Sequence, residues 1–432
     1  MKIAIVGSGI SGLAVAHALR DQAELTLFES GDYFGGHTHT VDVTLPTSAG
    51  LRTWGVDTGF LVFNERTYPK LIALLAELGV ATAKSDMSFS VKARGVLGER
   101  TLEWSGTSLN TVFAQRRNLL SPRFLRMLRE VLRFNRLATQ LAVAGQDAEL
   151  QSALGEWLQA QRFSAEFRDG YFLPMMACIW SCPTAQMLAF PVSTMVRFCH
   201  NHGLIQVQGR PQWWTVTGGA RRYVEKIIAS VPDKRLSTPV RSIARDAQGV
   251  TLYTDAGSER FDEVVLAVHS NQALALLRQP SAAEVSTLGA IRYQANRAVL
   301  HTDASVLPER RLAWAAWNYE RAAASGQEAR PVCLHYLLNK LQRLPFEQPV
   351  IVTLNPVRAI EADQVLGDFD YEHPVFDLPA IRAQAAMPQL QGQQNTWYCG
   401  AWMGYGFHED GLNAGLAVAQ QLRERIALAG AP

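Results

Sequence analysis

The 432-residue sequence predicts a two-domain α/β protein, in which a parallel-sheet domain is interleaved along the chain with a mixed-sheet domain that carries a helical insertion. Three observations predict this fold. The chain opens on a β-α-β pattern, short strand patterns return after a long helical stretch, and one more strand and helix close the sequence. An apolar content of 48% is sufficient for a large buried core.

The first element is an apolar strand, 2–6, and it is followed by the run Gly7-Ser8-Gly9-Ile10-Ser11-Gly12, which opens a helix extending to residue 20. The glycines permit a tight turn, a close backbone approach to a pyrophosphate and close helix packing. The helix N-terminus offers free N–H groups to the same anion. The next strand, 25–28, ends in Glu29, which suits a ribose diol. This pattern indicates a Rossmann-like dinucleotide site built from Gly7, Gly9, Ser11, Gly12 and Glu29.

A second glycine turn, Gly35-Gly36 followed by His37, comes just after this unit and is suited to the same pyrophosphate. A strand is expected near 54–63, within which lies the run Gly55-Val56-Asp57-Thr58-Gly59-Phe60. Residues 66 to about 200 have mostly helical patterns. The clearest have apolar positions three and four residues apart, at 68–78, 123–143 and 151–161.

Strand patterns return after residue 217. We expect the chain to re-enter the nucleotide domain with strands at 238–243, 250–254 and 263–268, and to form a separate sheet with strands at 298–302, 332–338 and 350–354. A strand at 396–400 and a helix at 411–428 complete the fold. The nucleotide domain is thus expected at 1–65, 206–285 and 393–432, the helical cap at 66–205 and the substrate sheet at 286–392.

These motifs together resemble the flavin-containing amine oxidase superfamily, which includes protoporphyrinogen oxidases, carotenoid desaturases and flavin-dependent fatty-acid isomerases. The resemblance covers nearly the whole chain. It rests also on Thr217-Gly218-Gly219-Ala220, Thr238-Pro239-Val240 and Tyr398-Cys399-Gly400. The runs Gly35-Gly36-His37-Thr38-His39-Thr40 and Gly406-Phe407-His408-Glu409-Asp410-Gly411 are similar to a bacterial family of predicted FAD-binding oxidoreductases.

The resemblance implies an FAD cofactor and assigns residues to it. Glu29 would bind the adenosine ribose and the Val240 backbone the adenine, while amides near Gly411 and Leu412 would face the flavin pyrimidine edge, where a helix N-terminus favours negative charge. His37 and Ala401 stand where relatives often have an arginine and an acid. The remaining cofactor-binding residues that the resemblance implies are Gly36, His37 and Gly400, with Thr58, Gly59 and Phe60 beside the isoalloxazine.

Three residues of the last glycine-rich segment are candidates for the substrate site. His408 stands where amine oxidases commonly have an aromatic cage residue, so its imidazole is a candidate catalytic group, with an ordinary pKa near neutrality, or else a hydrogen-bonded structural residue. Trp402 and Tyr405 are expected to line the substrate pocket, whereas most other tryptophans are expected in the core.

These residues predict an FAD-dependent oxidoreductase that removes hydride from an apolar small molecule such as a lipid acyl chain. An amine oxidase and a redox-neutral isomerase of unsaturated fatty acids remain alternatives, and the replacement of a cage aromatic by His408 argues against the former. No second G-x-G-x-x-G is present, so oxygen, a quinone or an internal redox cycle is a more natural electron partner than a nicotinamide.

The charges and the apolar runs limit the kinds of partner that the protein is expected to have. The net charge of +2 is too small to indicate nucleic-acid binding. The first strand directly follows Met1 and no apolar run approaches the roughly 20 residues that span a bilayer. We therefore expect a cytoplasmic protein. A basic helix face, formed by Arg126, Arg129, Arg133 and Arg136, could lie on the inner face of the membrane, although a solvated cap helix is the plainer interpretation.

The five cysteines fit reduced thiols, because they form an odd set without regular spacing. Cys178, Cys182, Cys199, His200 and His202 could be interpreted as a zinc cluster. Their apolar neighbours and loose spacing favour buried structural cysteines instead, and no metal is expected.

Overall fold

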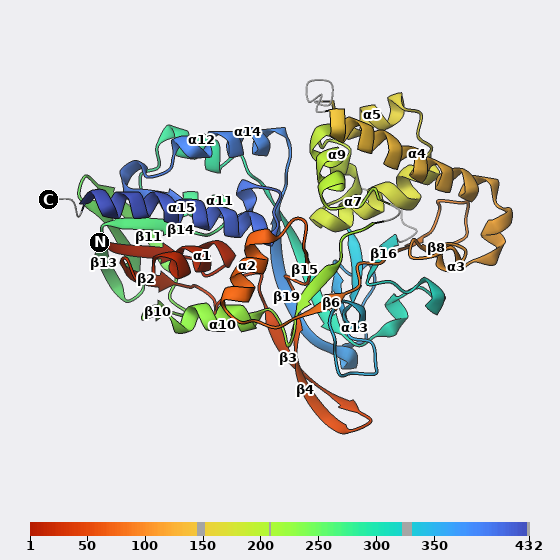
Figure 1. Cartoon of the computed structure of the whole chain (residues 1–432), viewed down its shortest axis with the longest axis horizontal. Coiled ribbons are helices and arrows are strands. Elements are labelled where there is room, and N and C mark those ends of the chain that lie inside the picture. The colour runs from red at the N-terminus through yellow and green to blue at the C-terminus, as the bar shows by residue number, and fades with distance from the viewer. Residues whose placement is uncertain (145–151, 207–208, 322–330, 430–432) are drawn as a thin grey trace.

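The computed structural model describes residues 1–144, 152–206, 209–321 and 331–429. It is elongated, with the nucleotide domain and both chain ends on one side and the sheet and helices of the second domain on the other (Figure 1). The predicted fold class is confirmed. The domain boundaries expected from the sequence remain a prediction.

The nucleotide domain is built on a parallel sheet that collects strands from distant parts of the sequence. Its order is β10 (Asp233–Arg235), β2 (Glu24–Phe28), β1 (Lys2–Val6), β14 (Glu263–Leu266) and β20 (Thr396–Tyr398). All four neighbouring pairs run parallel. The chain therefore returns to this sheet twice after leaving it, as the interleaved pattern predicts.

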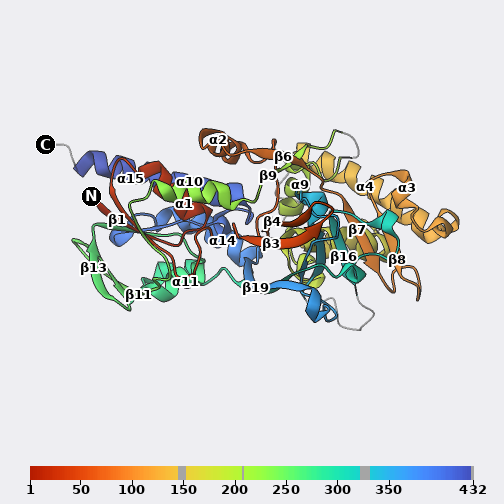
Figure 2. The ribbon, with the colours of Figure 1, turned by 90° about the horizontal axis from the view of Figure 1, so that it is seen from below.

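Two layers cover this sheet, because its strands carry apolar side chains on both faces. Ile3 and Ile5 pack with the helices α1 (Ile10–Leu19), α10 (Arg221–Ala229) and α15 (His408–Ala429). Ala4 and Val6 face a second cluster on the other side. An antiparallel sheet contributes to that cluster with β11 (Val240–Asp246), β12 (Gly249–Thr254) and β13 (Gly257–Phe261), and the view from below shows both layers (Figure 2).

The second domain contains a seven-stranded mixed sheet. Its order is β19 (Val365–Pro374), β15 (Tyr293–His301), β18 (Ile351–Leu354), β17 (Cys333–Leu337), β16 (Trp317–Arg321), β7 (Phe89–Ala93) and β8 (Leu102–Ser105). Only β16 and β7 pair in parallel. The expectation that residues 66–200 are mostly helical is wrong for 82–105, where β6 (Thr82–Ser85), β7 and β8 lie.

The loops between the domains also differ from the sequence prediction. The strand expected at 54–63 is instead β4 (Gly50–Asp57), which forms a hairpin with β3 (Thr40–Thr47) and ends at Asp57, followed by the short β5 (Phe63–Asn64). β5 and β6 pair with β9 (Trp213–Val216) in a small sheet. The last helix begins at His408, three residues before the expected start.

The helical insertion forms the cap. α4 (Pro122–Ala144) packs against α9 (Val192–Asn201), and α5 (Leu154–Ala160) and α7 (Leu173–Trp180) complete its main helices, whereas α2 (Pro69–Glu77) packs on α15 of the nucleotide domain. Residue 151 of the expected 151–161 helix lies outside the described residues. No helix among the described residues is long and apolar enough to cross a bilayer.

The predicted basic face of α4 is only partly available to an outside partner. Arg126 pairs with Glu130 at 3.6 Å and with Glu166 at 3.8 Å, and the guanidinium of Arg133 lies 4.1 Å above the Phe163 ring and donates to the Gln161 carbonyl. Two of the four arginines are therefore engaged in contacts within the cap: Arg133 is half-buried, whereas Arg126 stays 61% exposed.

Candidate active site

A cavity of about 670 Å³ is lined by residues of both domains. One end is formed by the turn between β1 and α1, the end of β2 and the loop after β20. The other end is formed by α7, α9 and the mixed sheet. Twelve of the sequence-predicted site residues line it, namely Gly7, Gly9, Ser11, Glu29, Gly36, His37, Gly59, Phe60, Val240, Gly400, Trp402 and His408.

The glycines of the first turn have distinct roles. Gly7 has φ +100°, and a Cβ there would lie 2.6 Å from the Ala267 carbonyl oxygen, while a Cβ at Gly12 would lie 2.0 Å from the Gly7 oxygen. A Cβ at Gly9 would meet nothing within 4 Å, because it would point into open space. The first turn of α1 opens at this point without a side-chain cap, so its free N–H groups and the room above Gly9 fit a pyrophosphate.

Glu29 lies at the end of β2, beside this turn. One carboxylate oxygen accepts from the Ser8 backbone N–H at 3.0 Å and from the Ser8 hydroxyl, and the other accepts from the Gly31 N–H at 2.8 Å. The carboxylate therefore organises the turn. The oxygen that faces Ser8 already accepts twice, so the acceptor capacity for a ribose diol lies on the oxygen that accepts from Gly31.

His408 is the first residue of α15 and is held from two sides. Its ring stacks on Phe60, with centroids 3.8 Å apart and an interplanar angle of 10°. Its Nε2 hydrogen-bonds with the Tyr223 hydroxyl at 2.7 Å and with Thr38 Oγ1 at 3.1 Å. The two hydroxyls also bond to each other at 2.6 Å. This network fixes the ring at the wall of the cavity.

The expectation of a His408 pKa near neutrality is wrong. Burial, and to a lesser degree the neighbouring His37, lowers the pKa of His408 to about 3. The imidazole is therefore neutral at physiological pH and can exchange hydrogen bonds but does not carry a positive charge. Sequence reasoning missed Tyr223 because nothing local links it to the segment around His408.

The other predicted residues lie behind the cavity wall. Gly411 donates its N–H to the Phe407 carbonyl at 3.1 Å, and a Cβ there would lie 2.7 Å from Ile10 Cγ2, so this glycine allows α15 to pack closely on α1. Tyr405 packs on Phe198 with centroids 6.2 Å apart. The predicted site residues that do not line the cavity are Gly12, Thr58, Gly411, Leu412 and Tyr405.

Trp402 lines the cavity on the nucleotide side. Its indole N–H donates to the Val268 carbonyl at 3.0 Å, and the ring belongs to the core cluster behind the parallel sheet. Thr58 is buried and hydrogen-bonds with Tyr371 at 2.7 Å. The bond to Val268 and the packing in this cluster place Trp402 with the nucleotide domain, whereas the sequence suggested that it would line the substrate pocket.

The cap end of the cavity is an aromatic and aliphatic chamber. Among its polar groups is His202, whose Nδ1 donates to the Phe198 carbonyl at 3.1 Å. Burial lowers the pKa of His202 to about 4, so the ring is neutral. The apolar residues that line this end include Met87, Ile179, Phe198, Leu204, Trp213, Trp317, Tyr336 and Phe407. No local sequence pattern identified this set, because its members are scattered along the chain between residues 87 and 407.

Three further histidines line the cavity near Gly36. The His37 ring lies 5.4 Å from His373 and 6.1 Å from His269. Burial lowers the pKa of His37 and His269 to about 4 and that of His373 to about 3. Within the described part of the chain, His37 Nε2 is buried without a hydrogen-bond partner. A cofactor acceptor in the cavity is one group that could satisfy it.

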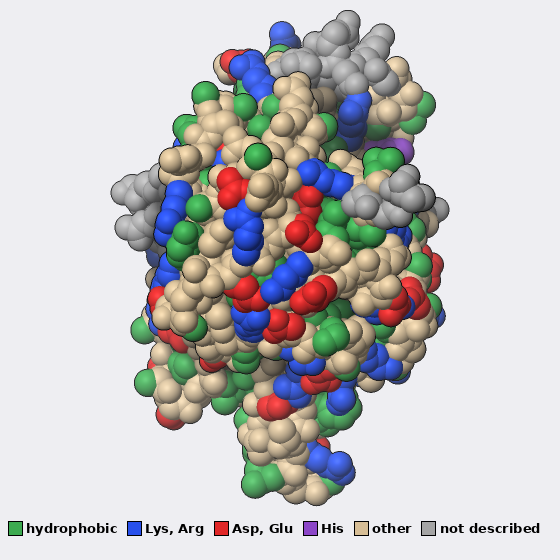
Figure 3. All heavy atoms as spheres, turned by 90° about the vertical axis from the view of Figure 1, so that its left-hand side faces the viewer, with side chains coloured by type: hydrophobic (Ala, Val, Ile, Leu, Met, Phe, Trp, Pro, Cys, Tyr) green, Lys and Arg blue, Asp and Glu red, His purple; other side chains and the backbone are tan. Residues whose placement is uncertain are grey.

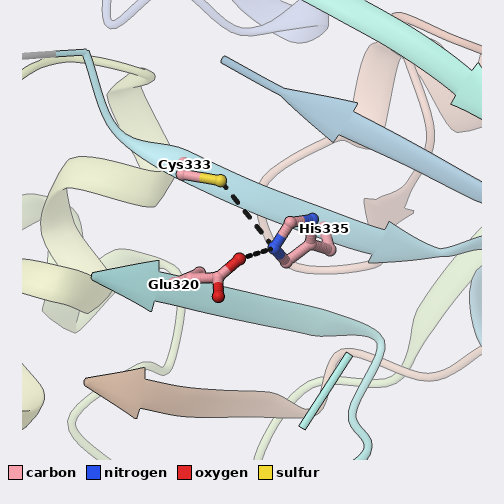
Figure 4. Close-up of side chains that lie close together, drawn as sticks. All are labelled: Glu320, Cys333 and His335. Carbon is pink, nitrogen blue, oxygen red and sulfur yellow. Dashed lines mark hydrogen bonds and ion pairs between the residues drawn. The ribbon is translucent and has the colours of Figure 1, made fainter. Parts of the chain in front are cut away.

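A separate polar cluster lies on the sheet face that points away from the cavity. Trp317 and Tyr336 pair across β16 and β17 and line the cavity, so the alternating Glu320, Cys333 and His335 project to the opposite face (Figure 4). Glu320 Oε2 lies 3.0 Å from His335 Nε2, and Lys92 Nζ lies 2.9 Å from Glu320 Oε1.

This cluster has the side-chain types that bind a metal ion, but its carboxylate and thiol are not in the free, deprotonated states that a metal ion needs. Burial would raise the pKa of Glu320, but the His335 hydrogen bond and the Lys92 charge lower it to about 2, so the carboxylate is already paired. Burial raises the pKa of the Cys333 thiol to about 12, whereas a metal requires a thiolate. The cysteines of the other candidate cluster, Cys178, Cys182 and Cys199, are buried.

Comparisons with known proteins agree with this geometry. A model of the family described as flavin containing amine oxidoreductase matches residues 10–315. The structure is similar to a CLA-producing fatty acid isomerase from P. acnes (16% identity, TM-score 0.66, covering 97% of this chain and 98% of that chain). It is also similar to the cyclohexylamine oxidase of Brevibacterium oxydans IH-35A (16% identity, TM-score 0.68, 99% of each chain).

A putrescine oxidase bound to putrescine is a further similar structure, with 17% identity and a TM-score of 0.69 over 98% of this chain and 100% of that one. No curated protein matches the sequence. Identities this low show the fold alone, whereas the family model carries the assignment. The chain belongs to the flavin containing amine oxidoreductase family and is an FAD-dependent oxidoreductase.

Proposed function

We propose that this enzyme removes hydride from an uncharged, apolar substrate such as a lipid acyl chain, with FAD as the hydride acceptor. The observation that carries the proposal is the lining of the cavity. None of its described residues is Lys, Arg or Asp, and Glu29 and Glu372 are its only carboxylates. Apolar walls of this kind bind hydrocarbon and exclude water from the reacting carbon.

One of the two carboxylates already has hydrogen-bond partners. Glu29 accepts from Ser8 and Gly31, whereas Glu372 lies 3.4 Å from Nδ1 of the neutral His269 and gains no opposite charge from it. The histidines of the lining have lowered pKa values and are neutral, so they do not offer a positive charge to an anion. An anionic substrate would lose its hydration without gaining an opposite charge, which is costly. The chemistry therefore favours a neutral substrate portion within the chamber.

For the cofactor, we propose that the residues predicted from the sequence hold FAD along the nucleotide end of the cavity. Gly7, Gly9 and Gly36 would approach the pyrophosphate, Glu29 the ribose and Val240 the adenine. Thr58, Gly411 and Leu412, which lie behind the wall, would support it indirectly. His408 would act as a neutral hydrogen-bonding group positioned by Tyr223.

Two alternatives have specific support. An amine oxidase is favoured by the aromatic rings of the chamber, which can stabilise a cation, and by the likeness to cyclohexylamine and putrescine oxidases. A redox-neutral isomerase is favoured by the likeness to the fatty acid isomerase. Neither alternative changes the cofactor site, so the substrate decides between them.

Anaerobic mixing of the purified holoenzyme with matched substrates tests the proposal. A methyl ester of a long unsaturated acid should bleach the flavin absorbance, and the alkylamine of the same length should not. Mass spectrometry of the product should show the loss of two hydrogens. An unchanged mass with a moved double bond would indicate the isomerase, and bleaching by the amine alone would indicate the amine oxidase.

We also propose that the enzyme meets its acyl substrate at the surface of a membrane. The arginines of α4 were the basis for this idea in the sequence, and Arg126 and Arg133 now contribute less because they are engaged within the cap. Arg129 and Arg136 remain exposed on that helix. Contact with a lipid surface would need a surface that combines charge with apolar side chains.

A further inference from the structure

The tip of the cap exposes large apolar side chains. Leu109 lies on α3 (Leu109–Val112), and Leu119 and Leu120 end the 3-10 helix η1 (Arg116–Leu120) that precedes α4. Their exposed fractions are 78%, 51% and 89%. Single exposed leucines are common on protein surfaces, but several on one short segment indicate an interaction surface.

Arginines accompany these leucines, and their charges are not neutralised by the contacts that they make. Arg116 donates to the backbone carbonyls of Asn110 and Phe113, at 3.2 and 2.9 Å, and Arg117 donates to the Thr101 carbonyl at 3.4 Å. Between residues 104 and 146 the sequence has one acid, Glu130, which is buried and accepts from Ser164. We name the leucines and arginines of this segment, Leu109, Leu119, Leu120, Arg116 and Arg117, the cap surface.

Neighbouring elements add charges of both signs. The turn η4 (Arg311–Ala313) contacts α3 and brings Arg311 close, and Arg100 stands one residue before Thr101. The exposed acids of these elements are Glu99 and Glu309. The opposite end of the molecule differs, because basic and acidic side chains are interspersed there (Figure 3). Arg241 pairs with Asp255 and Arg260 with Asp246 at that end.

We infer that the cap surface docks on an anionic lipid bilayer, with its leucines inserted among the acyl chains and its arginines at the level of the phosphates. Leucine and arginine together fit the two layers of a bilayer surface, the apolar interior and the anionic headgroups. A nucleic acid would use the arginines but not the protruding leucines. That docking gives access to acyl substrates rests on the proposed function. The binding of the cap surface to a bilayer does not depend on that function.

Co-sedimentation of the FAD-loaded enzyme with vesicles tests the inference. Wild type should bind vesicles of equimolar phosphatidylglycerol and phosphatidylcholine at low salt and ignore pure phosphatidylcholine. The double variant Leu119→Ser/Leu120→Ser should lower the partition coefficient about tenfold or more, because it removes the inserted groups. Arg117→Gln/Arg129→Gln should weaken binding mainly at low salt, where charge attraction is least screened.

A matched control is Leu51→Ser, because Leu51 is 74% exposed at the β3–β4 hairpin, away from the cap. It should bind vesicles as wild type does. Flavin content and thermal unfolding of every variant establish that it is folded. The inference is overturned if wild type ignores the anionic vesicles, if the leucine variant binds equally well, or if Leu51→Ser loses as much binding as that variant.

A fluorescent label gives an independent measurement. All five native cysteines are buried, so Leu120→Cys offers a selective site for an environment-sensitive dye, and Leu51→Cys is its control. Anionic vesicles should shift the emission of the dye at position 120 to the blue and leave that at position 51 unchanged. Equal shifts at both positions contradict the inference. Neither the co-sedimentation nor the dye emission depends on reduction of the flavin. Failure of the acyl-substrate proposal would therefore be seen in a separate experiment, in which detergent-dispersed acyl lipid leaves the flavin absorbance unchanged.

Discussion

Within one glycine-rich turn, Gly9 and Gly12 are required for different reasons. Gly9 has the extended backbone angles φ −64° and ψ 174°, which any residue adopts, and its Cβ direction is open. Gly9→Val should therefore fold normally but fail to retain FAD, because the side chain would occupy the space of the pyrophosphate. Gel filtration with absorbance at the flavin band measures retention, and wild-type flavin content would refute this assignment.

Gly12→Val is the matched contrast. Its Cβ would lie 2.0 Å from the Gly7 carbonyl oxygen and 3.2 Å from Ala267 Cβ, so α1 would have to move off the sheet. We expect the free energy of unfolding to fall by about 3 kcal/mol, in addition to any loss of FAD. Chemical denaturation of the apoproteins measures this. Equal stabilities for the two variants would mean that Gly12 has no packing role.

Glu29→Ala tests the contact with the ribose. The variant should weaken FAD binding by about 1 to 3 kcal/mol, because a charged hydrogen-bond acceptor is lost. Since Glu29 also accepts from Ser8 and Gly31, Glu29→Gln should restore part of the turn. Titration of the apoprotein with FAD gives the dissociation constants. An unchanged value for Glu29→Ala would show that the carboxylate serves the turn alone.

At the level of elements, one buried carboxylate joins three segments. Asp57, at the end of β4, accepts from the Ala220 N–H at the start of α10 and from Gln342 Nε2 at 2.6 Å, at the end of α13 (Leu338–Leu341). Its own N–H donates to Gln342 Oε1 at 3.1 Å. Gln342 is thus one of the polar contacts that connect the hairpin to the mixed-sheet domain.

Gln342→Ala should lower the free energy of unfolding by about 1 to 3 kcal/mol, because it leaves a buried donor and a buried acceptor without this partner. Gln348→Ala is the control, since that side chain is half-buried nearby in the chain and has no hydrogen bond described. Urea denaturation of both variants measures the difference. Equal stability of the two would indicate that water replaces Gln342 at no cost.

Elements with strong local patterns were predicted well from the sequence. The first β-α-β unit follows from its apolar runs and glycines, and the helices at 69–77 and 122–144 follow from their apolar spacing. β8 was missed because all four of its residues are buried, among them Glu103, which reads as a surface residue and is paired with Arg310 at 2.9 Å. When buried and exposed residues do not alternate along a strand, its sequence lacks the two-residue period by which a strand is recognised.

The candidate site shows the same limit. Its glycines and Glu29 were found because they are close in sequence and have a known geometry. The bond between Tyr223 and His408 joins residues 185 positions apart, and the chamber residues come from scattered segments. Burial also changed the chemistry of His408, since its low pKa depends on surroundings that the sequence does not display.

For the whole molecule, the buried histidines predict acid sensitivity. Burial lowers their pKa in the fold, so the unfolded chain binds more protons. The free energy of unfolding must therefore decrease as the pH falls below about 6.5 and toward the lowered pKa values of the folded protein. Asp57 and Asp410 act in the opposite direction, because burial raises their pKa to about 7 and about 6. The histidines with lowered pKa are more numerous: His37, His39, His202, His269, His301, His335, His373 and His408.

The melting temperature should therefore fall between pH 7 and pH 5, by several degrees. Differential scanning calorimetry across this range measures it. His301→Gln, remote from the cavity lining, should reduce the slope of stability with pH without changing FAD affinity, because burial and not the cofactor lowers its pKa to about 4. A melting temperature that rises on acidification would show that the two aspartates dominate.

The interleaving of the parallel sheet has a consequence for how the chain is made. A ribosome delivers β1 and β2 early, but β14 follows only after the whole cap, and β20 only after the whole mixed sheet. Until Tyr398 emerges, β14 has an unpaired edge, and α1 lacks the cover of α15. Such edges invite aggregation, and non-local pairing is slow. Nascent chains should therefore need protection by chaperones until synthesis is nearly complete, and flavin capture should be a late, post-translational step rather than a nucleus for folding.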